Sequence, residues 1–295
     1  MNILVLGGTR FFGMKTVKLL IEKNHNVTIA TRGTTEHPFG NQVSHIILDV
    51  EDKAHDGWDE VLENEWDAVF SNITYTKEDA ELLTDKLSEV TDHVYFTSSM
   101  AVYSGDKDGY KESDFDPFSY KVDPSKDVDY GEGKRQAEES LFTDAPFAVT
   151  SFRFPIVLDE DDYTERLHFY VKKAVAGEII YFKKPDVKIN YVKGTKAAES
   201  IVWAIENQKE GIYNVSSSDA ITVETFIEWL NEAVSEEVTV EYSDANESSP
   251  FSTSHDQYLI SDKIASEGFE LSNLEDWLKP LIKLLVAEAK GDYAN

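Results

Sequence analysis

The chain has 295 residues, of which 41% are hydrophobic and 12% aromatic, enough for one large folded domain or two modest ones. It contains no cysteine, which excludes disulfides and thiolate metal sites, and its seven histidines are scattered, so we expect no bound metal. Acidic residues outnumber basic ones by 56 to 28, and the formal net charge of −28 argues against nucleic acid as a partner, because binding phosphates requires Lys and Arg.

The amino terminus carries neither the basic start nor the apolar stretch of a signal peptide, and no window of about 20 apolar residues is present. We therefore expect a cytoplasmic protein that does not associate with a membrane. The excess of acidic residues is interpreted as a highly solvated surface.

The first half of the chain alternates strand and helix patterns. Strands are predicted at Asn2–Leu6, Val27–Thr31, Val43–Leu48, Ala68–Asn72, Val94–Ser98 and Ala148–Phe154. Helices are predicted at Phe12–Glu22, Trp58–Leu62, Glu78–Glu89 and Tyr130–Leu141. This alternation predicts an α/β fold with a Rossmann-like, doubly wound parallel sheet covered by helices on both faces.

After Pro155 the alternation is less regular. Helices are predicted at Tyr163–Ala176, Lys196–Glu206, Val223–Ala233 and Leu274–Ala289, and strands at Glu178–Phe182, Lys188–Val192, Gly211–Val215 and Val238–Tyr242. We predict a dinucleotide-binding Rossmann domain over residues 1–157 and a smaller α/β substrate-binding lobe over residues 158–295. Strands or helices of the later chain are allowed to return to the first domain.

The segment "GGTRFFG" lies between the first predicted strand and the first predicted helix, where a dinucleotide fingerprint is expected. Gly7 allows the tight turn, Gly13 lets helix and strand approach, and the start of the helix faces the pyrophosphate. Arg10 stands where such turns often have their central glycine. The alternative is a glycine-rich turn that binds no ligand.

The end of the second strand, "NVTIATRG", has no carboxylate for the adenosine ribose; instead Thr31 is followed by Arg32. A guanidinium binds a 2′-phosphate through paired hydrogen bonds, so NADP is favoured over NAD, with Arg10 reaching the same phosphate from the neighbouring turn. The alternative is that Arg10 covers the adenine or is solvated. Asp49, after the third strand, is a candidate partner for the adenine amino group.

The segment "YGEGK" places Tyr130 and Lys134 four residues apart on one helix face. An ammonium beside a phenol lowers the pKa of the phenol. Together with a serine of "TSSMAVY", this set indicates hydride chemistry in which the tyrosine transfers a proton and the lysine holds the nicotinamide ribose. The alternative is a tyrosine and a lysine on a surface helix without catalytic function.

These motifs resemble those of extended short-chain dehydrogenases/reductases of the NAD-dependent epimerase/dehydratase family. The resemblance covers nearly the whole chain and is carried by Gly7, Gly13, Asp49, "SSMAVYS", Tyr130, Lys134 and "FRFPIV". It implies a Rossmann core, a nicotinamide cofactor and a homodimer, and it selects Ser99 rather than Ser98 as the catalytic serine. The implied cofactor contacts are Gly7, Thr9, Arg10, Phe11, Phe12, Gly13, Thr31, Arg32, Asp49, Val50, Asn72, Tyr130, Lys134, Pro155 and Val157. "GGTRFFG" itself resembles the branch of chloroplast stem-loop-binding proteins, whose members are not all enzymes.

Departures from the family pattern narrow the expected chemistry. Sugar dehydratases of the family have Thr-Asp-Glu where this chain has Ser99, Met100 and Ala101, so dehydration by that route is not expected. Past Arg153 only Arg166 is available to clamp a substrate diphosphate. We expect an NAD(P)-dependent oxidoreductase or epimerase acting on a hydroxyl or carbonyl of a small or sugar-like substrate. The alternative is a catalytically silent NAD(P)-binding regulatory or RNA-associated protein.

The loop "SGDKDGYKESDFDP" has spaced acids but lacks the full ligand run of a calcium loop, so we interpret it as a solvated lid. Its region contains Tyr110, Phe115, Phe118 and Tyr120, which either cover a substrate or pack the lid down.

Overall fold

A computed structural model describes residues 1–125, 127–243 and 249–293 of the chain. Residues 292 and 293 are described by their backbone alone. The chain divides into two compact units. The first comprises Met1–Ser104, Glu112–Phe154 and Ala197–Val215, and the second comprises Gly105–Lys111, Pro155–Lys196 and Ser216–Asn295.

Within the described residues, the first unit is built on a seven-stranded sheet in the order β11-β6-β5-β4-β1-β2-β3, with every neighbouring pair parallel. The strands are β1 (Asn2–Leu6), β2 (Asn26–Thr31), β3 (Ser44–Ile47), β4 (Ala68–Ser71), β5 (His93–Ser99), β6 (Ala148–Phe154) and β11 (Gly211–Asn214). The strand order reverses between β1 and β4. In open parallel sheets, this point at the carboxyl edge is where ligands bind.

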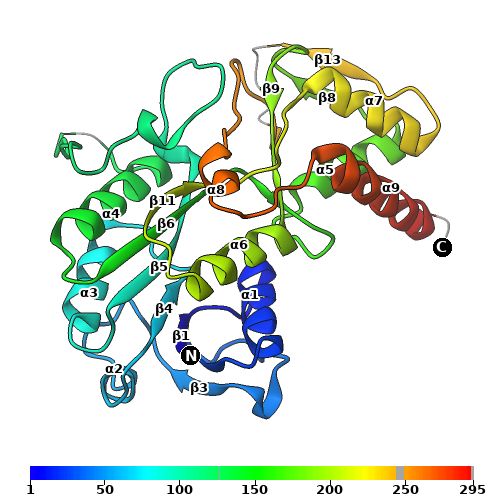
Figure 1. Cartoon of the computed structure of the whole chain (residues 1–295). Coiled ribbons are helices and arrows are strands. Elements are labelled where there is room, and N and C mark those ends of the chain that lie inside the picture. Colours follow the sequence, from blue (N-terminus) through cyan, green and yellow to red (C-terminus); the bar gives the residue numbers. More distant parts are fainter. Residues whose placement is uncertain (126, 244–248, 294–295) are drawn as a thin grey trace. The chain divides into compact units, whose positions relative to one another are not determined.

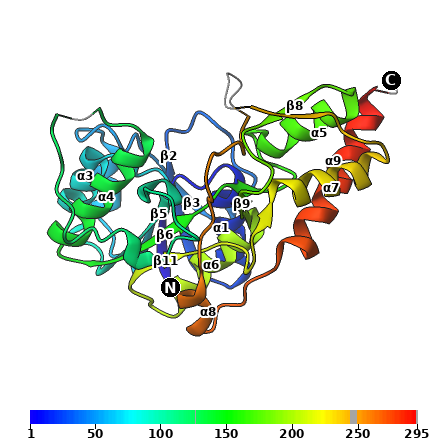
Figure 2. The same ribbon diagram turned by 90° about the horizontal axis from the view of Figure 1, so that it is seen from above.

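Helices cover both faces of this sheet (Figure 1; Figure 2). They are α1 (Phe11–Glu22), α2 (Gly57–Leu62), α3 (Lys77–Leu87), α4 (Tyr130–Asp144) and α6 (Gly194–Glu206), with short 3₁₀ helices η1 (Gly40–Gln42), η2 (Met100–Val102) and η3 (Glu112–Asp114). On one face, Leu4, Val69 and Val94 pack with Leu83 of α3 and Leu141 of α4 in one buried cluster. The other face carries α1 and α6. The predicted doubly wound α/β fold is therefore confirmed.

The later chain returns to the first unit through α6 and β11. β11 pairs with β6 in parallel, with Gly211 opposite Thr150, and forms the edge of the sheet beside β6. Pairing between segments about 60 residues apart leaves no mark on local periodicity. Sequence patterns alone therefore detect the strand but not the sheet to which it belongs.

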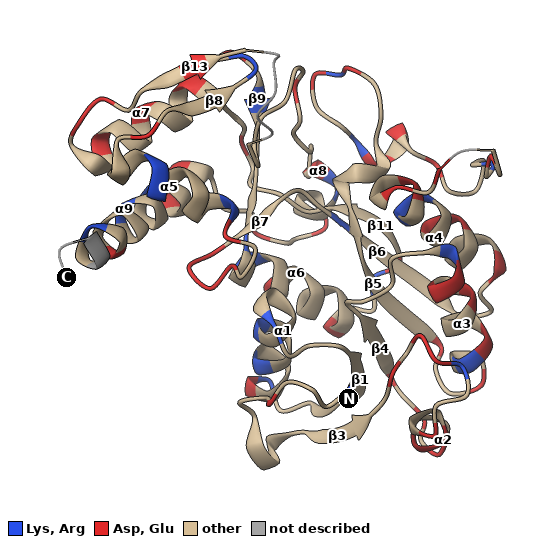
Figure 3. Cartoon of the chain, turned by 180° about the vertical axis from the view of Figure 1, so that it is seen from behind, with Lys and Arg blue, Asp and Glu red and all other residues tan. Residues whose placement is uncertain are grey.

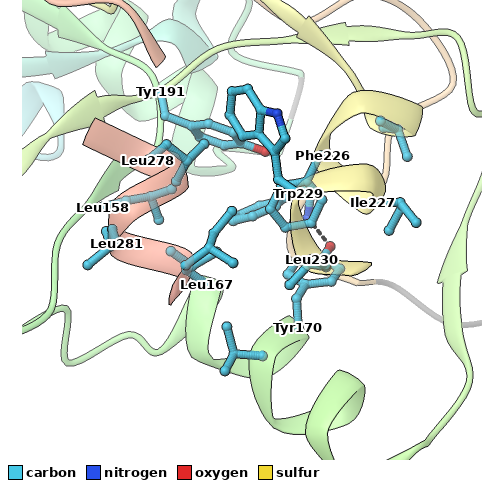
Figure 4. Packing of buried hydrophobic residues seen from close by; sticks show 14 of the residues in the cluster. Leu158, Leu167, Tyr170, Tyr191, Phe226, Ile227, Trp229, Leu230, Leu278 and Leu281 are labelled. Atoms are coloured by element: carbon cyan, nitrogen blue, oxygen red, sulfur yellow. Dashed lines mark hydrogen bonds between the residues drawn. The ribbon is translucent and has the colours of Figure 1, made fainter. Parts of the chain in front are cut away.

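The second unit contains α5 (Arg166–Ala176), α7 (Val223–Val234), α8 (Asp262–Ser266) and α9 (Leu274–Tyr293). Its short strands pair two by two: β7 (Val157–Leu158) with β10 (Val192–Lys193), β8 (Ile180–Phe182) with β13 (Val240–Tyr242), and β9 (Lys188–Ile189) with β12 (Ile221–Thr222). Figure 4 shows the core of this unit, in which Leu167 and Tyr170 of α5 pack with Phe226 and Leu230 of α7 and Leu281 of α9.

Several elements of the second unit differ from the prediction, including α8, which was not predicted, and two of the differences have an identifiable physical cause. The strand predicted at Lys188–Val192 is divided into β9 and β10, because buried Asn190 uses its side chain to bond Leu259 on both its N–H and its C=O. The helix predicted from Tyr163 begins only at Arg166, since Glu165 has a left-handed backbone with φ of +52°. Polar side chains and one backbone torsion thus override the apolar pattern.

Asp and Glu residues are spread over many helices and loops of both units, with fewer Lys and Arg residues among them (Figure 3). No helix in the described part of the chain is long and apolar enough to cross a membrane.

Candidate active site

The turn between β1 and α1 brings its glycines into close backbone contact. Gly7 and Gly8 have φ values of +93° and +85°, which residues with a side chain rarely adopt. A Cβ on Gly8 would lie 2.8 Å from Cγ1 of Val5, and one on Gly13 would lie 3.3 Å from the Cα of Gly8. The first turn of α1 therefore approaches the end of β1 closely. Backbone N–H groups of a first helical turn lack helical acceptors and are suited to a pyrophosphate.

The backbone explains how Arg10 replaces the usual glycine. Its φ of −138° and ψ of 148° are extended values open to any residue, and it is the N-cap of α1. The left-handed conformation falls instead on Phe11, with φ of +47° and a buried ring. Phe12 packs against both Phe11 and Phe154, with ring centroids 5.7 and 5.6 Å apart. Thr9 is half-buried, and the Arg10 side chain is exposed. An arginine here is thus compatible with a nucleotide-binding turn.

Asn72 connects the glycine turn to β5. Its Nδ2 lies 2.8 Å from the position of a Cβ on Gly13, and its Oδ1 accepts a hydrogen bond of 2.8 Å from Oγ1 of Thr97. The carbonyl of Thr97 in turn accepts a hydrogen bond of 2.6 Å from Nζ of Lys134. The predicted residues Gly13, Asn72 and Lys134 are therefore joined by a continuous set of contacts.

The ends of β2 and β3 lie beside each other, because the N–H of Leu48 donates to the carbonyl of Thr31 at 2.8 Å. Arg32 follows Thr31 and is exposed, while Asp49 and Val50 follow Leu48 and are half-buried. The structure thus brings four of the predicted adenosine-side residues to one edge of the sheet.

Lys134 is almost fully buried, and its ammonium is held at three sides. Its Nζ donates to the carbonyls of Thr74 and Thr97, each at 2.6 Å. It lies 4.5 Å from the ring centroid of Tyr75 and 5.8 Å from that of Tyr130, which is 55% exposed. The third N–H of an ammonium remains to be directed at another group.

Burial lowers the pKa of Lys134 to about 7, against the carboxylates of Glu138 and Asp79, which raise it. The charge of this lysine is therefore adjustable near neutral pH, a property that clusters at functional sites.

Helix α4 also contacts the segment that carries the candidate serine. A Cβ on Gly131 would lie 2.6 Å from the carbonyl oxygen of Ala101, so only glycine allows this approach. Ser99 accepts a hydrogen bond of 3.1 Å from the N–H of Ala101 and is partly exposed. Ser98 is buried and donates to Glu138 at 2.5 Å. This difference favours Ser99 over Ser98 as the serine that can reach a substrate.

The sequence analysis missed a buried ion pair behind this segment. Glu138 and Arg153 are both fully buried, and their Oε2 and Nη2 atoms lie 2.5 Å apart. Arg153 also donates to the hydroxyl of Tyr103 at 2.9 Å. Burial lowers the pKa of Arg153, but Glu138 and Tyr103 outweigh it and raise that pKa overall. The pair ties α4, β6 and the chain after Ser99 together. The signal in the sequence was an acid one helical turn after Lys134.

Pro155 and Val157 belong to the Pro155–Lys196 segment of the second unit, whereas the other predicted cofactor residues belong to the first unit. Val157 is buried and pairs with Val192 through β7 and β10.

Comparison with solved structures shows the same fold at low sequence identity. The UDP-glucose 4-epimerase of Thermotoga maritima, solved with UDP-glucose, superposes with a TM-score of 0.73 at 17% identity and covers 100% of both chains. A UDP-N-acetylglucosamine 4-epimerase from Bacillus cereus has a TM-score of 0.72 at 19% identity, covering 98% of this chain and 99% of its own. The Thermus thermophilus UDP-glucose 4-epimerase in complex with NAD has a TM-score of 0.70 at 18% identity, covering 99% of both.

Among curated proteins, the chloroplast stem-loop binding protein of 41 kDa b from Arabidopsis thaliana is 25% identical over 236 residues. The match covers 75% of this chain but only 60% of the relative, so this chain spans about three fifths of that protein's length. The model of the NAD dependent epimerase/dehydratase family matches residues 3–216, which include the glycine turn and the segments of Ser99, Tyr130 and Lys134. The chain therefore belongs to the NAD-dependent epimerase/dehydratase family.

Proposed function

We propose that the protein is an NAD(P)-dependent oxidoreductase or epimerase that acts on a hydroxyl or carbonyl group of a small or sugar-like substrate. The observation that carries this proposal is the position of Lys134. Its Nζ lies 5.8 Å from the ring of Tyr130 and donates to Thr97, two residues before Ser99. The same Thr97 bonds Asn72, which packs on the glycine turn. A nucleotide laid on that turn would extend toward the phenol.

The chain's own residues fit such a cofactor. A Cβ on Gly8 or on Gly13 would lie 2.8 Å from a neighbouring side-chain atom, of Val5 and Asn72 respectively, so the glycines keep the turn tight, and the start of α1 supplies N–H groups for the pyrophosphate. Arg32 and Arg10, both exposed, would bind a 2′-phosphate, and on this ground we propose NADP as the preferred cofactor. Arg32→Gln should then weaken NADP⁺ binding about 10-fold or more and leave NAD⁺ binding unchanged. A clear preference of the unmutated protein for NAD⁺ would overturn this part of the proposal.

When bound, the nicotinamide supplies the acceptor and donor for a hydride. Tyr130 takes the proton from the substrate hydroxyl or returns it to the carbonyl. Lys134, when charged, stabilises the phenolate of Tyr130 and directs its remaining N–H toward the ribose. Ser99, whose oxygen accepts from Ala101, has its own proton to donate to the substrate oxygen.

The class of substrate is proposed from the family and from the fold. The neighbours whose names include UDP-glucose or UDP-N-acetylglucosamine support a sugar-like substrate. The second half of the chain contains only two arginines, Arg153 and Arg166. This scarcity argues against a substrate diphosphate held tightly by arginine side chains. We propose a sugar-like hydroxyl or carbonyl compound and use UDP-glucose, UDP-galactose and glyceraldehyde as probes.

The test is Tyr130→Phe, assayed with each probe in the presence of NADP⁺ or NAD⁺ and, for the aldehyde, NADPH or NADH. Turnover should fall about 100-fold or more, since general acid–base catalysis contributes that much, while the cofactor dissociation constant stays within about twofold. Tyr163→Phe is the control, because it removes the hydroxyl of a similarly exposed tyrosine outside α4. Full activity of Tyr130→Phe would refute the assignment.

The relative named for stem-loop binding supports a second candidate, an RNA-associated protein that retains the fold. The net charge of −28 opposes it. An electrophoretic mobility shift with a stem-loop RNA at physiological salt decides between the two: a shift with no nicotinamide binding would favour the second candidate.

A further inference from the structure

The loop before α4 is connected to the candidate serine through a chain of polar contacts within the first unit. It begins at Tyr120, whose hydroxyl oxygen lies 2.7 Å from each carboxylate oxygen of Glu132 and donates its single proton to that carboxylate. Glu132 is 4% exposed and also accepts a hydrogen bond of 3.0 Å from Nε of Arg135. The contacts thus run from the loop into the first turns of α4.

Arg135 connects α4 to η2 through hydrogen bonds. Its Nη1 donates to the carbonyls of Ala101 and Val102, at 3.2 and 3.3 Å. The N–H of the same Ala101 donates to Oγ of Ser99 at 3.1 Å. Ala101 therefore accepts a hydrogen bond from Arg135 through its carbonyl and donates one to the Ser99 oxygen through its N–H.

The electrostatics keep both partners of the ion pair charged. Burial raises the pKa of Glu132, but hydrogen bonds from Gln136, Tyr120 and Arg135 outweigh it and lower that pKa overall. An ion pair of this kind, with Glu132 buried and Arg135 partly buried, contributes little net stability compared with apolar side chains of similar size. Its presence here, against the backbone of η2, therefore points to placing that backbone.

The same contacts relate Ser99 to Tyr130 and Lys134 of α4. Tyr130, Glu132, Lys134 and Arg135 all lie on the first turns of helix α4. A clamp from Arg135 onto Ala101 sets the position of Ser99 with respect to the phenol and the ammonium of the same helix. Because Ser99 accepts from Ala101, its proton points away from that N–H.

We propose that Arg135, held by Glu132 and Tyr120, is a positioning residue that aims the Ser99 hydroxyl at the substrate oxygen. This inference rests on the proposed function. It also gives Tyr120 a role. By bonding Glu132, the tyrosine holds the loop on α4 and so helps to position Ser99 through Arg135, and it does not cover the substrate.

The test is a double-mutant cycle with Arg135→Met and Ser99→Ala, measured on the probe that the unmutated protein turns over. Arg135→Met alone should lower kcat about 10- to 100-fold, because small misplacements of a reacting group have effects of that size. In the Ser99→Ala background it should lower kcat no more than about twofold further, since a residue that acts through the serine has nothing left to position. The cofactor dissociation constant should stay within about twofold.

Three additional measurements sharpen the test. Arg135→Lys should recover only part of the lost kcat, because an ammonium keeps the positive charge but donates from one nitrogen and cannot reproduce the guanidinium contacts with both Glu132 and Ala101. Lys18→Met is the control, since it removes an exposed ion pair between Lys18 and Glu22 on α1 and should leave kcat unchanged. Amide exchange in residues 100–103 should accelerate in Arg135→Met, which reports on the clamp without any turnover. If Arg135→Met does not fold, Tyr120→Phe removes one hydroxyl and should show the same dependence on Ser99 with a smaller loss.

Losses of kcat that multiply in the double variant, or unchanged kcat and unchanged exchange in Arg135→Met, would overturn the inference. Failure of the proposed function gives a different pattern: full activity in Tyr130→Phe, or no turnover of any probe by the unmutated protein, in which case the inference falls with it.

Discussion

The close approach of η2 to α4 leads to a quantitative prediction for Gly131→Ala. In an unobstructed helix this change would stabilise the protein by up to about 1 kcal/mol. Here the new Cβ would lie 2.6 Å from the carbonyl oxygen of Ala101 and 3.5 Å from Oδ1 of Asp129. The backbone of η2 must withdraw by roughly half an ångström, and overpacking of this kind costs about 1–3 kcal/mol. We expect a net destabilisation of about 1–2 kcal/mol.

The same displacement carries Ser99 with it, because Ala101 donates to the serine oxygen. We therefore also expect kcat to fall about 10-fold with an unchanged cofactor dissociation constant. Urea unfolding followed by circular dichroism measures the first effect, and steady-state assays measure the second. Gly291→Ala is the matched control, since nothing lies within 4 Å of its Cβ and it sits near the end of α9. If Gly131→Ala is as stable as this control and fully active, the reasoning is wrong.

Three further predictions concern stability. The pKa of Lys134 in the folded protein is about 7, below its ordinary value of 10.5, so the buried ammonium opposes folding at low pH and this cost is relieved as pH rises from 7 toward 10.5. The free energy of unfolding of the unmutated protein, relative to that of Lys134→Met, should therefore rise by roughly 3 kcal/mol between pH 7 and 10. A difference that does not change with pH in urea titrations would contradict this. Arg153→Met leaves Glu138 buried without its partner and should cost about 3–5 kcal/mol, most of it recovered when Glu138→Gln is added; a loss below about 1 kcal/mol by urea unfolding would refute the pairing. Thr76→Ala removes the acceptor for the N–H of Asp79 in the capping box of α3 and should cost about 1 kcal/mol in thermal or urea unfolding, whereas no change would show that the cap is not needed.

Local patterns were sufficient for the elements of the first unit. Asn2–Leu6 and Ala148–Phe154 agree with the prediction residue for residue. After Asn2 the first of these is a continuous apolar run, which is typical of a buried parallel strand. The pairing of β11 with β6 was not predictable in this way, since it depends on segments far apart in the chain. The short strands of the second unit, such as β7 with two residues, are too short for any periodicity to develop.

The sequence predicts candidate site residues, but it does not predict the contacts that hold them in place. The spacing of Tyr130 and Lys134 and the glycine turn were visible because each motif is local. Arg153 and Glu138 were not, because a buried ion pair joins residues 15 apart on different elements. One signal was present: glycine is costly inside a helix, so the glycines of "YGEGK" required a close approach, and Gly131 meets Ala101 as described.

The central claim is that a pyridine dinucleotide lies across the glycine turn with its reactive end beside Tyr130 and Lys134. A crystal structure of the protein grown with NADP⁺ tests it most directly. The account predicts the pyrophosphate at the first turn of α1 and a nicotinamide ribose hydroxyl within hydrogen-bonding distance of Nζ of Lys134. A dinucleotide bound elsewhere, or a ribose directed away from this lysine and from Tyr130, would contradict it.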